Sequence, residues 1–190
     1  MDLVEQHRRA MAEFDRRVQQ LTEDRWHVDT PCEEWDARTL VNHLVVEQLW
    51  VPHLLSGATL EQVGDRFDGD QLGDDPVGAW TRAAGPAREA VGTAGALDRT
   101  VHTSMGELPA SEYVTQLTMD LAIHAWDLAR ALEIDDTLDA ELVGELHRVW
   151  APRADELSGS GLFAPAIEVG ADADPQTRLL AELGRDARRG

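Results

Sequence analysis

The sequence predicts an all-α protein, an antiparallel bundle of four long helices. Three observations lead to this prediction: segments whose apolar residues recur every three or four positions, capping residues ahead of several of these segments, and little alternating strand pattern. The chain has 190 residues, of which 43% are hydrophobic. This content is enough for a single domain over residues 1–190 whose core needs no disulfide or structural metal.

The first two helices carry the clearest signals. Residues 2–21 have one apolar face at helical spacing, formed by Val4, His7, Met11, Phe14, Val18 and Leu21. The segment TPCEEWD then interrupts the pattern, because Pro31 disfavours helical geometry at Thr30. Asp36 stands at an N-cap position before ARTLVNHLVVEQLW. We therefore expect a second helix from about Asp36 to about Ser56.

The middle of the chain is less regular. Residues 64–76, GDRFDGDQLGDDP, are rich in Gly and Asp and predict a solvated loop. The following segment, PVGAWTRAAGPAREAVG, favours a third helix that is kinked or broken near Gly85, since Pro86 removes a backbone donor. Residues 98–109, DRTVHTSMGELP, are compatible with a short extended pair or with an irregular crossover.

Three further helices are expected in the second half of the chain. The segment SEYVTQLTMDLAIHAWDLARALE predicts a long helix with Ser111 as its cap. Another helix is expected from about Asp139 to Leu157, and a short one near DPQTRLLAELGRD.

Composition excludes several classes of function. The chain has 36 acidic and 17 basic residues and a net charge of −19, so its surface repels nucleic acid and anionic membranes. All 17 basic residues are Arg, which excludes lysine-dependent catalysis. We expect a cytoplasmic location, because the chain has one cysteine, no apolar run long enough to span a membrane and no signal-peptide pattern at its N-terminus.

Two polar stripes lie within apolar helix faces. At about 100° per residue, His43 falls in the middle of the apolar arc of its helix. In the helix after Ser111, the same spacing puts Asp120, His124 and Asp127 on one line bordered by apolar side chains. A carboxylate that points into a core needs a partner, a solvent-filled cleft or a cation.

These stripes predict a divalent metal site formed by His43, Asp120 and His124. Residues i and i+4 are neighbours on a helix, so Asp120 and His124 can share one ion, and His43 would be the third ligand from a facing helix. Three ligands leave open positions, as in catalytic sites. Zn²⁺ is the first candidate, and Ni²⁺, Co²⁺ and Fe²⁺ are alternatives. The other interpretation of the same pattern is a hydrogen-bonded core histidine and an Asp–His salt link.

Three more residues near the predicted site have two interpretations each. Asp127 is a candidate for orienting a ligand histidine or for a salt link to Arg38 or Arg130. Glu47, one turn from His43, is a candidate general base or a partly exposed helix residue. Cys32 is a potential nucleophile, but we interpret it as packing in the loop.

Other residues are secondary candidates. His7 lies on the apolar seam of the first helix, where a core role is the default interpretation and a fourth metal ligand is the rival one. Trp35, Trp50 and Trp126 flank the predicted site in sequence, where they would line an apolar pocket or pack within the bundle.

Three segments carry a resemblance to a known family: TPCEEWDARTLVNHLV, DLAIHAWDLARAL and FAPAIEVGADADPQTRLLAELGRD. The first two resemble the mycothiol-dependent maleylpyruvate isomerase-like proteins of the DinB/YfiT superfamily. The third is similar to the C-terminal tail of a single-domain actinobacterial subfamily of metal-binding proteins. The resemblance therefore spans nearly the whole chain.

The resemblance implies a DinB-like, up-down-down-up four-helix bundle with short extra elements and a C-terminal tail helix. It also implies a divalent metal held by His43, Asp120 and His124. The acidic ligand is Glu in the isomerases and Asp here, one methylene shorter. The isomerases carry an added C-terminal domain, whereas this chain ends soon after its tail helix, so the resemblance does not specify maleylpyruvate as the substrate.

The implied chemistry is that of a metal-dependent transferase or isomerase, with mycothiol as candidate co-substrate and a small electrophile as substrate. Thiolates are the nucleophilic form of thiols, and a metal favours them. The alternative is a non-enzymatic metal- or ligand-binding bundle with a sensor or stress-response role. A homodimer is a further expectation, because exposed apolar helix edges often pair.

Overall fold

The structure is a computed structural model that describes all residues except 33–34, 155–163, 171 and 189–190. The chain forms two compact units, Met1–Asp136 and Thr137–Gly190. The predicted metal ligands all belong to the first unit. The expectation of one domain over residues 1–190 stays a prediction.

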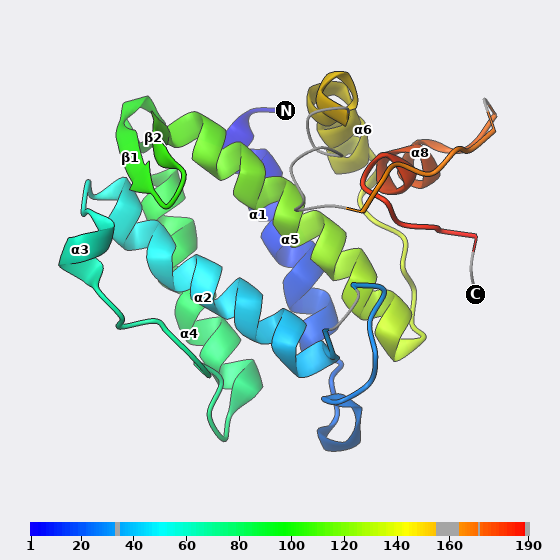
Figure 1. The fold of residues 1–190 in the computed structure, drawn as a ribbon, viewed down its shortest axis with the longest axis horizontal. Coiled ribbons are helices and arrows are strands. Elements are labelled where there is room, and N and C mark those ends of the chain that lie inside the picture. The colour runs from blue at the N-terminus through cyan, green and yellow to red at the C-terminus, as the bar shows by residue number, and fades with distance from the viewer. Residues whose placement is uncertain (33–34, 155–163, 171, 189–190) are drawn as a thin grey trace. The chain divides into compact units, whose positions relative to one another are not determined.

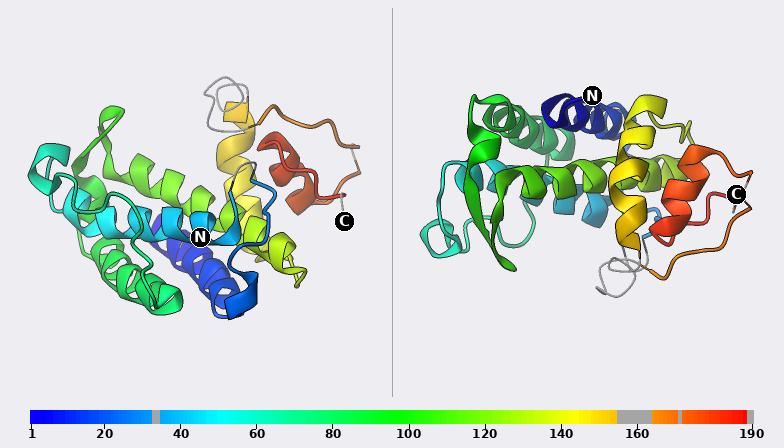
Figure 2. Two further views of the ribbon diagram at one scale, coloured as in Figure 1. Left: turned by 60° about the horizontal axis from the view of Figure 1, so that its bottom comes forward. Right: turned by 90° about the horizontal axis from the view of Figure 1, so that it is seen from above.

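The first unit is a bundle of four long helices, as the sequence predicts. They are α1 (Leu3–Val18), α2 (Ala37–Leu55), α4 (Pro76–Gly92) and α5 (Ala110–Leu132). Helices α1 and α5 run in one direction, whereas α2 and α4 run in the other, which gives the up-down-down-up order (Figures 1 and 2). Each helix packs on two others, with α1 against α5 and α4, and α2 against α4 and α5. The α2–α5 contact is the one that positions the predicted metal ligands.

Short elements connect these helices. They are the single turns η1 (Glu23–Arg25), α3 (Leu60–Val63) and η2 (Ala96–Asp98), and the strands β1 (Thr100–Thr103) and β2 (Gly106–Pro109). The two strands form an antiparallel hairpin in which Val101 pairs with Leu108. The segment at 98–109 is therefore the extended pair and not the irregular crossover.

The core of the bundle is built from the inward faces that the sequence pattern marks. Met11, Phe14, Leu40 and Leu44 are fully buried. Phe14 meets the ring of Trp80 edge to face at 4.7 Å, and the indole nitrogen of Trp80 donates to Asp15 at 2.9 Å. Helices α1 and α4 are thus joined by both an aromatic contact and a partly buried hydrogen bond.

Helix α2 begins where the sequence predicts. Asp36 is its N-cap, and its carboxylate accepts hydrogen bonds from the backbone N–H of Thr39 at 2.8 Å and from the Thr39 hydroxyl at 2.7 Å. Ser56 is the C-cap. His43 therefore lies in the second turn of a helix whose start is fixed by its own sequence.

Two helix predictions differ from the structure. Helix α4 is continuous through Gly85 and Pro86, so the break does not occur, while a kink there stays a prediction. Pro86 has no N–H to donate to the carbonyl of Arg82, four residues earlier. Both residues are on the exposed side of the helix, so this carbonyl can bind water instead. Helix α5 begins at Ala110, and Ser111 lies inside it instead of capping it. The reason is non-local: the amide of Ala110 donates to the carbonyl of Arg99 at 2.8 Å.

The second unit contains α6 (Ala140–Trp150), η3 (Ala151–Arg153) and α8 (Pro175–Glu182). Helix α6 begins after Asp139 as expected, but its predicted end at Leu157 lies outside the described residues. Helices α6 and α8 pack together, and His147 lies 3.1 Å from Glu182 between them. Helix α8 is the expected tail helix.

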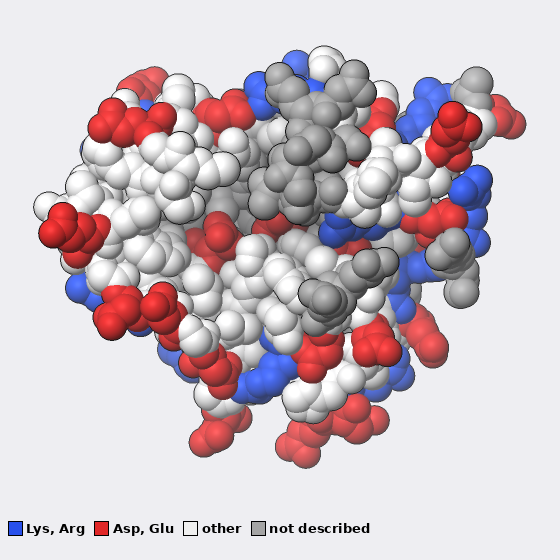
Figure 3. Space-filling model, in the orientation of Figure 1, with Lys and Arg blue, Asp and Glu red and all other residues white. Residues whose placement is uncertain are grey.

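Among the charged side chains on the surface, the acidic ones predominate. Asp and Glu outnumber Arg on the face shown in Figure 3, in keeping with the net charge of −19. Among the described residues, no helix combines the length and the apolar character that crossing a bilayer requires.

Candidate metal centre

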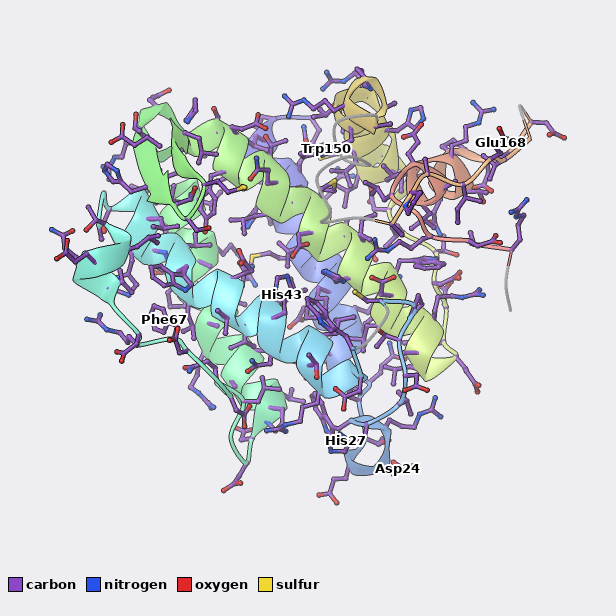
Figure 4. The ribbon with its side chains drawn as sticks, in the orientation of Figure 1. Asp24, His27, His43, Phe67, Trp150 and Glu168 are labelled. Atoms are coloured by element: carbon purple, nitrogen blue, oxygen red, sulfur yellow. The ribbon has the colours of Figure 1, made fainter. Side chains whose placement is uncertain are left out.

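The structure brings His43, Asp120 and His124 together between α2 and α5. His43 lies on the side of α2 that faces α5 (Figure 4). Its Nε2 atom is 3.0 Å from Oδ2 of Asp120, while Nε2 of His124 is 3.4 Å from Oδ1 of the same carboxylate. One donor atom from each residue lies within 4.8 Å of the others. We call these three residues the triad.

Asp127 makes a hydrogen bond with the Nδ1 atom of His124, the ring nitrogen that faces away from Asp120. Its Oδ2 atom is 2.9 Å from Nδ1 of His124, and its side chain is fully buried. The two arginines of the alternative interpretation bind other carboxylates, since Arg38 pairs with Asp70 at 2.8 Å and Arg130 with Asp136 at 3.0 Å. Asp127 is therefore placed to keep a proton on Nδ1 and to direct Nε2 toward the triad.

The electrostatics of the triad follow from burial and pairing. Burial opposes the charged form of Asp120, yet His124 and His43 hold the pKa of its carboxyl far below the usual range. Burial likewise opposes a charged His124, but Asp120 and Asp127 raise its pKa to about 9. Without a cation, a proton on His124 offsets one of the two negative charges beside it. A divalent ion can supply the same positive charge.

The loop before α2 lies over the triad. The ring of Trp35 is 4.9 Å from that of His43 and 5.6 Å from that of His124, measured between centroids. Backbone hydrogen bonds tie this loop to the start of α2, from Ala37 N to Val28 O at 3.0 Å and from Arg38 N to Trp26 O at 2.8 Å. Trp35 is thus a wall of the site, as the apolar-pocket interpretation expects.

The same loop brings Cys32 beside His124 and Asp127. One donor atom from each of these three residues lies within 4.8 Å of the others. Cys32 is half-buried, and its backbone N–H donates to the hydroxyl of Thr30 at 3.1 Å. The interpretation of Cys32 as loop packing misses this juxtaposition. Helical periodicity gives no signal for it, because the path of the loop depends on irregular hydrogen bonds, such as that from Ala37 N to Val28 O, and not on a repeating pattern.

Glu47 lies one turn beyond His43 on α2 and is half-buried. Burial, and then the carboxylate of Asp120, raise the pKa of Glu47 above the usual range. Burial and the charge of Glu47 also raise the pKa of Tyr113, well above that of an ordinary phenol. The Tyr113 hydroxyl is buried and makes no hydrogen bond within the described part of the chain. Sequence reasoning does not single out Tyr113.

Other candidate residues lie in different surroundings. The Trp50 ring packs edge to face on Phe67 at 5.6 Å, and the Trp126 ring has Arg130 over it at 5.5 Å. His7 is buried on α1, where burial and the charge of Arg88 lower its pKa to about 4. None of these residues belongs to the clusters of metal-ligand type found among the described residues.

The donor set of the triad fits a divalent transition metal. Two imidazole nitrogens and a carboxylate oxygen are ligands that Zn²⁺ and its neighbours accept, and Asp127 provides the outer hydrogen bond that ligand histidines require. The side chains of His43 and Asp120 are 30% and 24% exposed, so the triad is open to small molecules on one side. Such an open side is typical of catalytic more than of structural sites.

Fold and site together define a four-helix bundle with a His–Asp–His cluster between its second and last long helices. Residues 7–129 match the family model described as the mycothiol maleylpyruvate isomerase N-terminal domain. The match covers well over half of the chain and includes the triad. The chain belongs to this family.

Relatives and solved structures agree with this assignment. Two proteins of Mycobacterium tuberculosis, the uncharacterized proteins MT0763 and Rv0738, are each 31% identical over 99% of this chain and 100% of their own length. The crystal structure of the mycothiol-dependent maleylpyruvate isomerase superposes with a TM-score of 0.61 at 16% identity, over 83% of this chain and 70% of that chain. A mutant of that isomerase gives the same TM-score at 15% identity. These likenesses show that the fold is shared.

Proposed function

We propose that this protein is a divalent-metal-dependent transferase or isomerase that uses a low-molecular-weight thiol, with mycothiol as the first candidate, to act on a small electrophile. The observation that carries the proposal is the triad itself, three donor atoms within 4.8 Å of one another in a chain of the isomerase family. Zn²⁺ is the preferred ion and Ni²⁺ the alternative. When bound, such an ion favours the thiolate form of a thiol, which is the nucleophilic form.

The residues around the triad have separate tasks in this proposal. Asp127 keeps the proton on Nδ1 of His124, so that Nε2 presents its lone pair toward Asp120 and His43. Trp35 covers the two imidazoles and excludes water from one side of the site. The half-exposed edges of His43 and Asp120 form the side from which thiol and electrophile enter.

Glu47 supplies the proton transfer. A carboxyl whose pKa is raised by burial and by Asp120 holds and releases a proton nearer to neutral pH than an ordinary Glu. It stands one turn from His43, where it can take the proton of an incoming thiol or return one to the product. The hydroxyl of Tyr113, buried near this carboxyl, offers a hydrogen bond to a polar group of the electrophile.

The test is an incubation of the zinc-loaded protein with mycothiol and a panel of electrophiles, which includes cis-configured conjugated dicarbonyls and alkyl halides. We expect thiol-dependent turnover of at least one member. His43→Ala should lose turnover, and His124→Ala, which removes a ligand of every candidate cluster among the described residues, should lose both bound zinc and turnover. Glu47→Gln should keep its zinc and lose most of the turnover, about 10²- to 10⁴-fold for a general base.

A matched control is Glu61→Gln on α3, an exposed carboxylate outside the site, which should change neither quantity. If His124→Ala retains full zinc content, the metal assignment is wrong. If the wild-type protein binds zinc but neither consumes thiol nor responds to mycothiol in the spectrum of a cobalt-substituted sample, the non-enzymatic binding role replaces the enzymatic one.

A further inference from the structure

The loop before α2 brings the sulfur atom of Cys32 next to His124 and Asp127 on α5. Donor atoms of Cys32, His124 and Asp127 lie within 4.8 Å of one another, and these residues are half-buried, buried and fully buried in that order. His124 belongs to this cluster and to the triad alike. Its Nε2 atom faces Asp120, whereas its Nδ1 atom faces Asp127.

The chemistry of this cluster differs from that of the triad. A thiolate, an imidazole nitrogen and a carboxylate oxygen are all zinc ligands, and the sulfur selects thiophilic ions over Mg²⁺ and Ca²⁺. With metal–ligand bonds of about 2.0–2.3 Å, the ligand atoms of a tetrahedral ion are separated by about 3.3–3.8 Å. Donor atoms within 4.8 Å of one another would have to approach by no more than about 1.5 Å to reach this spacing.

We propose that Cys32, His124 and Asp127 form a second position for a thiophilic divalent ion, which shares His124 with the triad. The ion would take the Nδ1 lone pair in place of the hydrogen bond to Asp127. From a doubly protonated ring, binding releases two protons to water, one from the Cys32 thiol and one from Nδ1. The remaining Nε2 proton points to Asp120.

Sharing one imidazole makes the two positions alternatives. A neutral ring has a single lone pair, on Nε2 for the triad or on Nδ1 for the second position. In the second position the ion is bound by the chain's own sulfur and is withheld from the triad, so an external thiol meets a metal only after the ion moves. The loop that carries Cys32 and Trp35 would thereby hold the protein in a resting state.

Cobalt binding tests this directly, because Cys32 is the only cysteine of the chain. A thiolate ligand gives Co²⁺ an intense near-ultraviolet charge-transfer band, whereas nitrogen and oxygen ligands give only weak visible bands. In titrations without added thiol, we expect the charge-transfer band in the wild-type protein and, undiminished, in His43→Ala, which lacks one triad ligand. Cys32→Ser should lose this band and keep the visible ones.

The outcomes separate this inference from the proposed function. A folded His43→Ala variant that shows no charge-transfer band at saturating Co²⁺ overturns the second position, and visible bands in the wild-type protein would still support the triad. A band in His43→Ala together with no visible bands in Cys32→Ser supports the second position and argues against the triad. Circular dichroism of each variant confirms that the bundle is folded.

Discussion

At the scale of single residues, buried histidines in this protein have opposite electrostatic surroundings. His124 lies between two carboxylates that raise its pKa to about 9, whereas His7 is buried on α1, where burial and then Arg88 lower its pKa to about 4. The Nε2 atom of His7 makes no hydrogen bond within the described part of the chain. Both were sequence candidates for metal binding, yet only His124 has carboxylates beside it.

The low pKa of His7 predicts acid-sensitive stability. A base whose folded pKa is depressed binds its proton more readily when unfolded, so stability is complete above the unfolded value of 6.5 and falls as the pH drops toward 4. Between pH 7 and about pH 4.5, the free energy of unfolding should fall by about 2 kcal/mol less in His7→Leu than in the wild-type protein. Urea denaturation at several pH values measures it.

The half-exposed His102 on β1 provides the control for His7. His102→Gln should leave the acid profile of the wild-type protein unchanged. An acid profile of His7→Leu that coincides with that of the wild-type protein would mean that His7 binds its proton equally well in the folded and the unfolded state, and the burial argument would be wrong.

At the scale of elements, the parts whose signals are local agree with the sequence. Helix α2 starts after Asp36 because the carboxylate beside its first turn accepts the Thr39 N–H, a bond that the sequence alone suggests. The triad follows from spacing on two helices. The start of α5 depends instead on the bond from Ala110 to Arg99, and the path of the loop around Cys32 depends on bonds such as that from Arg38 to Trp26. No periodic pattern in the sequence encodes these bonds.

The cap of α2 gives a prediction at this scale. Asp36→Ala removes the acceptor for the Thr39 amide and should lower the free energy of unfolding by about 1 kcal/mol. Asp36→Asn keeps an acceptor at the same place and should lose only a few tenths. Urea titrations followed by helical circular dichroism measure both. Equal losses in the two variants would assign the effect to the charge of Asp36, which also lies 2.8 Å from His27, and not to the cap.

At the scale of the whole molecule, the dominant property is the charge of −19. Like charges repel more strongly in a compact state than in an unfolded one, and added salt screens this repulsion. We expect the melting temperature to rise between about 10 mM and 200 mM NaCl. The rise should be about 2–4 °C for each kcal/mol by which the salt increases the free energy of unfolding. Thermal unfolding in a buffer without chelators measures this.

A melting temperature that falls with added NaCl would show that surface ion pairs, such as that of Arg38 with Asp70, outweigh the net repulsion. Sucrose at a matched osmolality is the control, because it changes hydration without screening charge.

The contact between His43 and Asp120 also bears on how the molecule holds together. It joins residues 77 positions apart, on helices that come from different halves of the bundle. Closing a loop of that length costs about 4 kcal/mol of chain entropy. A cation bound by residues of both α2 and α5 would therefore act as a removable cross-link. Its effect would resemble that of a disulfide, which a chain with a single cysteine cannot form internally.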